Sequence, residues 1–289
     1  SKKKDFLIKE KNSLWKGYTL YNLYKKAHTP WNWHKAIFNE AKKNGILYFS
    51  TPFDHTAVKF LEKFNLPIYK VSSFENTDLR LIKIIAKTKK PLIISLGMAN
   101  LKEINEAVKT ARKNGCKKII LLKCTSDYPA KPEDANLISI EYLKKKFKCE
   151  VGLSDHTLGV ATSVAAIARG ATVIEKHFIY DKKLKGVDSK FSLDFKEMKR
   201  LVDESLCAWK SIGKVDFRPS KSERKNLKFR RSIYIVKDMK KGEKFSIENI
   251  KCIRPGYGVG TKHFDNILRK TAARSVTRGS AFQWSMVKN

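Results

Sequence analysis

The sequence predicts an α/β protein of the TIM (β/α)8-barrel class, followed by a small β-rich domain. From about residue 45 to about residue 212, short apolar runs rich in β-forming residues alternate with longer segments of helical period. Each run ends on polar residues, as the strands of a barrel do where they meet an active site. The chain has no G-x-G-x-x-G or Walker motif, which an open doubly wound sheet often carries. These observations together favour a barrel.

The strands are expected at residues 46–50, 68–72, 91–95, 118–124, 150–154 and 172–177. Between them lie amphipathic helices, and Ile104, Ala107, Val108 and Ala111 show the spacing of one buried helical face. A closed barrel of this class has eight strands. The sequence therefore predicts a barrel domain that lacks its first two βα units in this chain, preceded by an aromatic, loop-like segment of about forty residues.

Three parts follow each other along the chain. Residues 1–213 form the predicted barrel domain, and residues 214–229 form a basic, polar linker with one proline. Residues 230–289 contain short β-like runs separated by turns. A module of about sixty residues is near the lower size limit for independent stability, so it gains from docking onto another surface.

The composition indicates a protein that binds neither nucleic acid nor membranes. The formal net charge is +33, but the positive charges are mainly lysines spread over helix faces and turns, which is typical of a solvated surface. Such a field attracts small anionic substrates. No apolar run reaches the roughly 18 residues of a membrane span, and the first residues do not resemble a signal peptide, so a cytoplasmic location is expected. The five scattered cysteines are expected to be reduced and structural.

Two successive strands end on residues that could hold a metal ion. In a strand, alternate side chains share a face, so Ser154 and His156 project together while Asp155 points away. The same alternation places Glu175 and His177 on one face of the next strand. If the strands are neighbours, two imidazoles and a carboxylate converge, which suits a divalent metal with open positions. Two hydrogen-bonded histidines without a metal remain the alternative.

Hydroxyl groups and a lysine at the other strand ends predict an anion site. Lys70 lies at the end of one strand, with Ser73 and Glu75 just after it. Further hydroxyls are expected at the same edge of the sheet, from Thr51, Ser95 and Ser154. An ammonium surrounded by hydroxyls can hold a phosphate and a carboxylate. Each serine taken alone is more often a turn residue.

Short motifs along most of the chain resemble those of the sialic acid synthase family. They are STPFD at 50–54, YKVSSFE at 69–75, LKCTSDYP at 122–129, VGLSDHTLG at 151–159, IEKHF at 174–178 and DSKFSL at 188–193. FRRS at 229–232 and RPGYG at 254–258 resemble the antifreeze-like (SAF) domain of that family. LYNLY at 20–24, TPWNWH at 29–34 and SFE at 73–75 are most similar to the pseudaminic acid synthase branch.

The resemblance implies a metal-dependent condensation of phosphoenolpyruvate with an amino-sugar aldehyde. His156 and His177 would bind the metal, Mn²⁺ or Mg²⁺ with Co²⁺ as a further possibility. The phosphate and carboxylate would be held by Thr51, Lys70, Ser73, Ser95, Ser126 and Ser154. Glu75, Glu175 and Asp188 would contact the sugar or order water. Arg254 would reach the N-acyl group of the sugar from the partner subunit of a domain-swapped homodimer.

The sequence departs from the family pattern in two places. Leu96 stands where the family usually has threonine, and the first two barrel strands, which bring a glutamate and a lysine that binds phosphoenolpyruvate, have no counterpart before Ser1. The chain alone could therefore be inactive. The alternatives are a synthase of N-acetylneuraminic or legionaminic acid and, from another class, a non-catalytic fragment or basic binding protein on this scaffold.

Overall fold

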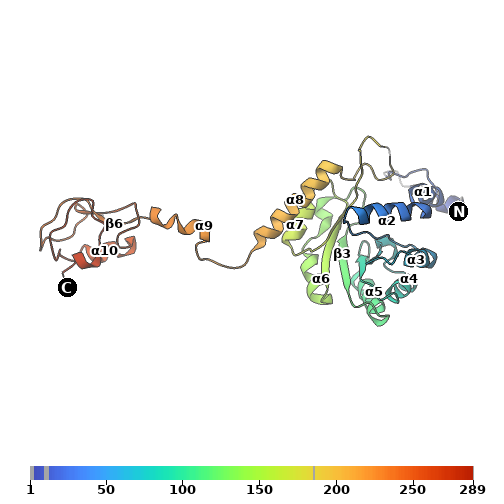
Figure 1. Ribbon diagram of the computed structural model, residues 1–289, viewed down its shortest axis with the longest axis horizontal. Coiled ribbons are helices and arrows are strands. Elements are labelled where there is room, and N and C mark those ends of the chain that lie inside the picture. Colours follow the sequence, from blue (N-terminus) through green and yellow to red (C-terminus); the bar gives the residue numbers. More distant parts are fainter. Residues whose placement is uncertain (1–2, 10–12, 185, 289) are drawn as a thin grey trace. The chain divides into compact units, whose positions relative to one another are not determined.

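The computed structural model describes residues 3–9, 13–184 and 186–288 (Figure 1). The chain divides into two units, and the division lies between Gly213 and Lys214. Each unit has its own hydrophobic core. None of the helices in the described ranges is long and apolar enough to cross a bilayer.

A parallel sheet of five strands forms the centre of the first unit, and the strands are in sequence order across the sheet. They are β1 (Tyr69–Val71), β2 (Leu92–Ser95), β3 (Ile119–Cys124), β4 (Glu150–Asp155) and β5 (Ile174–Lys176). A helix lies in each connection between neighbouring strands. Because all five strands run in the same direction, their carboxyl ends meet at one edge, where the polar residues described below lie.

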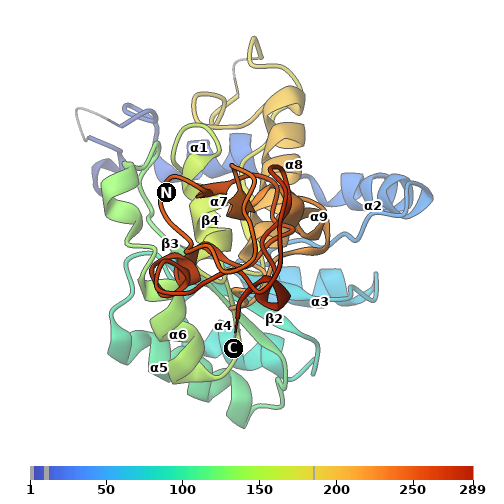
Figure 2. The same cartoon turned by 90° about the vertical axis from the view of Figure 1, so that its left-hand side faces the viewer.

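The helices that connect the strands lie along the outside of this sheet (Figure 2). They are α4 (Leu79–Ala86), α5 (Leu101–Lys113), α6 (Ser139–Phe147) and α7 (Ala161–Ala168). The first unit also contains α1 (Leu20–Ala27), α2 (His34–Lys43), α3 (His55–Glu62) and α8 (Phe195–Ile212). Local sequence sets where several of them begin. Asn100 and Asp194 start α5 and α8 with complete capping boxes. In each box the cap side chain accepts a hydrogen bond from a backbone N–H, and the glutamate three residues later accepts one from the backbone N–H of the cap residue.

A row of apolar residues crosses the sheet on its helix-facing side. Val71, Ile94, Leu121 and Val151 are paired in register on β1 to β4, and all four are fully buried. They belong to the same core cluster as Ile82 of α4. Burial of each such side chain contributes about 1.5–3 kcal/mol, and a slip of one residue would move the row to the wrong face. The row therefore fixes which residues project from the opposite, inner side.

The expected strand at residues 46–50 is wrong, because the structure places no strand there. Ile46 and Leu47 are 63% and 84% exposed, and the segment runs irregularly from α2 to α3. A β-strand needs a hydrogen-bonding partner, and none of the described residues forms a strand beside this segment. The other five expected strands are present, most of them one or two residues shorter than the sequence suggested.

The second unit is a small β-rich domain. Its two named strands, β6 (Ser232–Ile235) and β7 (Ile250–Ile253), pair in antiparallel fashion. Isolated bridges such as Tyr234 with Ala281 and Met239 with Val276 extend the pairing. The core holds Phe245 and Phe282, whose rings meet edge to face with centroids 5.1 Å apart. The unit also contains α9 (Lys221–Arg224) and α10 (Phe264–Ile267), so the segment expected to be a linker includes a short helix.

Candidate active site

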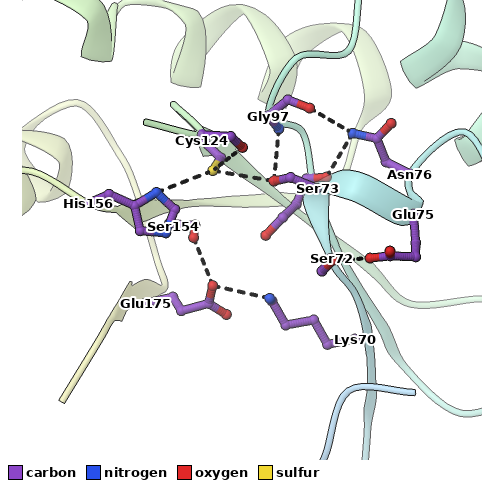
Figure 3. A network of polar contacts seen from close by, with 12 residues as sticks. Lys70, Ser72, Ser73, Glu75, Asn76, Gly97, Cys124, Ser154, His156 and Glu175 are labelled. Atoms are coloured by element: carbon purple, nitrogen blue, oxygen red, sulfur yellow. Dashed lines mark hydrogen bonds and ion pairs between the residues drawn. The ribbon is translucent and has the colours of Figure 1, made fainter. Parts of the chain in front are cut away.

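The inner side of the sheet carries a polar row at its carboxyl edge. Cys124, Ser154 and Glu175 are paired in register on β3, β4 and β5. Ser154 Oγ donates a 2.7 Å hydrogen bond to Glu175 Oε1, which also lies 3.2 Å from Lys70 Nζ (Figure 3). The Lys70 side chain is only 12% exposed, whereas Glu175 is 33% exposed. Strand alternation thus brings an ammonium, a carboxylate and a hydroxyl together at one point.

A second group of contacts links the ends of β1, β2 and β3. Ser73 Oγ donates to Cys124 Sγ at 3.3 Å and accepts a 3.1 Å hydrogen bond from Gly97 N. Asn76 Nδ2 donates to the carbonyl oxygens of Ser95 and Gly97 at 3.2 and 3.0 Å (Figure 3). A side chain at Gly97 would place its Cβ 2.1 Å from Ser126 Oγ, so the backbone here can approach the serines only as glycine.

Ser95 carries a hydroxyl with an unused hydrogen-bonding capacity. Its Oγ is buried and has no partner among the described residues. A buried, unsatisfied hydroxyl is unfavourable, and it points to a ligand or water at the inner side of the sheet. Ser126 Oγ lies 3.7 Å from Cys124 Sγ, which places it in the same group. Thr51 lies half-buried in the irregular segment before α3. Among the described residues, none of the hydrogen bonds that link the serines of the site involves Thr51.

His156 and His177 lie side by side at the ends of β4 and β5, with ring centroids 5.3 Å apart. His156 Nδ1 lies 2.8 Å from the carbonyl oxygen of Thr125, and His177 Nδ1 lies 3.4 Å from Asp188 Oδ2. The Thr125 carbonyl can only accept, so His156 Nδ1 is the donor of that hydrogen bond. In both rings, the nitrogen that faces these oxygens is Nδ1.

Aromatic rings surround the two histidines. The Tyr128 ring lies 4.4 Å from the His156 ring, and Phe191 lies 4.9 Å from His177, measured between centroids. Trp15 packs 5.6 Å from Tyr128 and donates from Nε1 to the carbonyl oxygen of Val187 at 3.0 Å. Burial raises the pKa of Tyr128 to about 12. The aromatic N-terminal segment therefore reaches the histidine side of the site through Trp15.

A small cavity lies next to the loop that carries Asp188. Its volume is about 210 Å³. Its lining comes from the N-terminal segment and from this loop: Leu14, Trp15, Tyr18, Lys26, Gly186, Val187 and Lys190. The cavity therefore lies between the aromatic segment and the loop that carries Asp188.

Cys124 and His156 influence each other's protonation. Burial by itself raises the pKa of the Cys124 thiol, but hydrogen bonds with His156 and Ser73 outweigh it and the net shift is downward. Burial lowers the pKa of His156, whereas its contacts with Cys124 and the Thr125 carbonyl raise it, and the net shift is upward. The Cys124 Sγ and His156 Nδ1 atoms are 4.0 Å apart. The cysteine that the sequence suggested to be merely structural thus lies within the site.

The predicted site residues do not all meet. Glu75 lies in the turn after β1 and accepts a hydrogen bond from Ser72 Oγ, separately from the contacts of Glu175 (Figure 3). Asp188 contacts His177. Arg254 belongs to the second unit, where it follows β7 and is exposed.

Sequence reasoning missed the part of the site that depends on register. Asn76, Gly97, Cys124 and Tyr128 each contact other members of the site, yet each is unremarkable in its local sequence. The alternation of β3 offered one usable signal, because it places Cys124 in phase with inward-facing Leu122. The same alternation correctly predicted that Asp155 points away from Ser154 and His156.

Comparisons with known proteins agree with this architecture. The NeuB family matches residues 1–217, and a SAF domain matches residues 230–288. The pseudaminic acid synthase of Campylobacter jejuni is 44% identical over 283 residues, which is 98% of this chain and 82% of that protein. The N,N'-diacetyllegionaminic acid synthase of the same species is 44% identical over 245 residues, 84% of this chain and 73% of that protein.

A solved structure shows the same relationship. The N-acetylneuraminic acid synthetase of Leptospira borgpetersenii, in complex with citrate, has a TM-score of 0.67 and 34% identity, over 71% of this chain and 72% of that chain. The sheet with its polar carboxyl edge and the β-rich module that follows it thus have counterparts in known synthases. By sequence and by structure, this chain belongs to the NeuB family and carries a C-terminal SAF domain.

Proposed function

We propose that the chain is a pseudaminic acid synthase. It would condense phosphoenolpyruvate with 2,4-diacetamido-2,4,6-trideoxy-altropyranose and water to give pseudaminic acid and phosphate. The observation that carries the proposal is the meeting of Lys70, Glu175, His156 and His177 at one edge of the sheet. Near full-length similarity to a pseudaminic acid synthase supports the choice of reaction.

Phosphoenolpyruvate would bind between Lys70 and the serines. The ammonium of Lys70 offers charge and hydrogen bonds to a carboxylate or phosphate. Ser95 Oγ is buried without a partner among the described residues, and a substrate oxygen would satisfy it. Ser73, Ser126 and Ser154 supply further hydroxyls, while Gly97 keeps the backbone close to them. The net charge of +33 would help to attract this anion.

The two histidines fit a divalent metal. Because their Nδ1 atoms face the Thr125 carbonyl and the Asp188 carboxylate, both Nε2 lone pairs are available, an arrangement common among metal-binding histidines. No group of three or more potential His, Cys, Asp or Glu ligands gathers in the described part of the chain, so other ligands would be water or substrate oxygens. A bound Mn²⁺ or Mg²⁺, or alternatively Co²⁺, would supply Lewis acidity that polarises the sugar aldehyde.

The reaction forms one carbon–carbon bond and, from water, one carbon–oxygen bond, and it breaks the carbon–oxygen bond between C2 and the phosphate. C3 of phosphoenolpyruvate attacks the aldehyde carbon, whose oxygen takes up a proton. Water then adds at C2 and loses a proton. The bond between C2 and the phosphate oxygen breaks, and its electron pair leaves with the phosphate. Glu175, held by Ser154 and Lys70, is placed to orient a sugar hydroxyl or to take a proton from the water. Asp188 and Glu75 would contact the sugar from either side.

A second candidate is an N,N'-diacetyllegionaminic acid synthase. The identity to that enzyme is also 44%, although over a smaller share of the chain. Phe74 is 61% exposed next to Ser73, and an apolar ring there suits the methyl group of a 6-deoxy sugar. Both 6-deoxy sugars carry this methyl group, whereas the precursor of N-acetylneuraminate does not. The longer match favours pseudaminic acid.

We also propose that the sheet is part of an eight-stranded barrel and that the enzyme is a domain-swapped homodimer. Val202, Leu206 and Trp209 lie on one face of α8 and are 58%, 48% and 63% exposed, a stripe that a neighbouring βα unit of a closed barrel would cover. The exposed Arg254, next to Pro255, would reach the N-acyl group of a sugar bound to the partner subunit. The five free cysteines are compatible with a reducing cytosol.

The test is product formation by the purified chain. It is incubated with phosphoenolpyruvate, the altro-configured sugar and Mn²⁺, and phosphate release is measured beside mass and NMR spectra of the product. The proposal expects phosphate and pseudaminic acid in equal amounts, both dependent on the sugar. Phosphate release without the sugar, or no product from folded protein at any metal concentration, would support a non-catalytic scaffold instead.

A further inference from the structure

A buried ion pair lies directly behind the two histidines. Asp155 of β4 and Lys176 of β5 are register partners, their Oδ2 and Nζ atoms are 2.7 Å apart, and both side chains are 1% exposed. Strand alternation directs them to the helix-facing side, whereas their sequence neighbours Ser154 and Glu175 face the site. The pair therefore does not touch substrate.

The pair holds the chain on both sides of His156. Lys176 Nζ donates to the carbonyl oxygen of Thr157 at 2.5 Å as well as to Asp155. Asp155 Oδ1 accepts from Thr157 N at 2.8 Å, and Ser163 Oγ from α7 donates to Asp155 Oδ2 at 2.6 Å. Residues 155 and 157 are thus closed into one turn, and His156 is its central residue. The hydrogen bond from Nδ1 to the Thr125 carbonyl then fixes the orientation of the His156 ring.

The same pair determines where His177 lies relative to His156. Lys176 is the last residue of β5 and directly precedes His177, so its anchored side chain ties this strand end to the turn that carries His156. A metal site tolerates errors of only a few tenths of an ångström between its ligands. One ion pair therefore controls the spacing of two imidazoles that come from different strands.

Stability alone is a poor explanation for this arrangement. A buried ion pair is often no more stabilising than apolar residues of similar volume, because both charges must leave water. An apolar pair, however, could not bond to both the N–H and the carbonyl of Thr157. In the structure, both oxygens of Asp155 and the Lys176 ammonium have close partners. The polar pair provides directional contacts around His156 that packing cannot.

We infer that Asp155 and Lys176 are positioning residues for the metal site, an inference that rests on the metal role proposed for His156 and His177. They act through the backbone and not through contact with metal or substrate. Their loss should weaken metal binding while the protein stays folded. Residues that orient metal ligands typically change metal affinity about 10- to 100-fold when removed.

The experiment measures Mn²⁺ affinity and thermal stability of the full chain. The double variant Asp155→Leu with Lys176→Met removes both charges together, so no buried charge is left unpaired. Free Mn²⁺ is titrated by electron paramagnetic resonance, and Tm is measured by calorimetry. The matched control is Glu150→Gln with Lys144→Met, which removes a pair involving the start of β4, whose Nζ and Oε2 atoms are 3.5 Å apart.

The inference expects a Kd for Mn²⁺ that rises about 10-fold or more in the Asp155–Lys176 variant and stays within about twofold in the control. A folded double variant that binds Mn²⁺ like the wild type would overturn it, whatever the change in Tm. If the double variant does not fold, the Kd for Mn²⁺ is measured on Ser163→Ala instead. This variant removes one hydrogen bond to Asp155 and keeps both charges. It should raise Kd a few-fold, and an unchanged Kd would count against the inference. Failure of the wild type to bind Mn²⁺ would instead refute the metal role itself.

Discussion

The ammonium of Lys70 lies 3.2 Å from the carboxylate of Glu175, although the two residues come from the first and last strands of the five-stranded sheet. Curvature of the sheet brings its inner residues together across intervening strands. The pair forms at the open carboxyl edge, where a substrate anion can compete with Glu175 for the lysine. The site therefore holds its main cation in place before substrate binds.

Replacement of Lys70 by Met should remove the main charge that binds phosphoenolpyruvate. Hydrogen bonds to charged groups contribute about 1.5–3 kcal/mol, so kcat/KM should fall roughly ten- to hundredfold, with a higher KM for phosphoenolpyruvate. Lys144→Met, at an exposed lysine of α6, is the control and should behave like the wild type. Steady-state kinetics at varied phosphoenolpyruvate measure both values. An unchanged KM in Lys70→Met would remove this lysine from the anion site.

Replacement of both His156 and His177 by Ala should abolish Mn²⁺ binding and condensation. The two rings are the imidazole ligands of the proposed metal site, and their contacts with Thr125 and Asp188 are made through Nδ1. The far-ultraviolet circular dichroism spectrum should be retained. His55→Ala, at an exposed position in α3, serves as the control. Full activity of the double variant in chelator-treated buffer would contradict the metal assignment.

Asp54 should stabilise the first unit in a pH-dependent way. Its Oδ1 accepts from the backbone N–H groups of Thr56 and Ala57 at 2.6 and 3.0 Å and so caps α3. Hydrogen bonds, first from the Thr56 side chain and then from Ala57 N, lower its pKa below the usual 3.8. A lowered folded-state pKa gives stability that is present above about pH 3.8 and is lost as the pH falls through the folded value.

Asp54→Ala should therefore lower the free energy of unfolding by about 1 kcal/mol at neutral pH, and the difference from wild type should shrink in acid. Asp54→Asn is the matched control, because it keeps a side-chain acceptor for the helix but cannot titrate. Urea titrations between about pH 7 and pH 3 measure the effect. A difference that stays constant over this range would show that the carboxylate charge plays no part.

Arg254 should act on the site of the partner subunit. Arg254→Ala and Lys70→Ala should each be strongly impaired as separate homodimers. After subunit exchange in an equal mixture, half of the dimers contain both variants, and each of these has one intact site if Arg254 acts in trans. About a quarter of wild-type activity should then return. A mixture that stays inactive after exchange has been confirmed by native mass spectrometry would place Arg254 in its own subunit's site.

Local rules predicted the histidine part of the site well. Alternation along a strand is a property of the backbone, so Ser154, His156, Glu175 and His177 could be placed on one side, and Asp155 on the other, before any contact was known. The contacts that hold residues 155 and 157 on either side of His156 could not be predicted. They depend on the register between Asp155 and Lys176 and on the approach of Ser163 from α7.

Non-local pairing explains what the sequence could not predict. The run at residues 46–50 has the composition of a buried strand, yet it forms none because no described strand lies beside it. Cys124 resembled an ordinary core cysteine until the register placed it between Ser73 and His156. Composition reveals which residues can pair, whereas the partners depend on the rest of the fold.

Substrate preference distinguishes a pseudaminic acid synthase from the related synthases. The measurement is kcat/KM for the altro-configured 2,4-diacetamido-2,4,6-trideoxy sugar, for the 6-deoxy sugar precursor of N,N'-diacetyllegionaminic acid, and for N-acetylmannosamine. Phe74 is exposed beside Ser73, and an apolar contact of this kind discriminates a methyl from a hydroxymethyl group by about 1–3 kcal/mol, so the altro-configured sugar should be preferred over N-acetylmannosamine about 10- to 200-fold. Its kcat/KM should also exceed that of the precursor of N,N'-diacetyllegionaminic acid. Equal values, or faster turnover of either competitor, would contradict the assignment as a pseudaminic acid synthase.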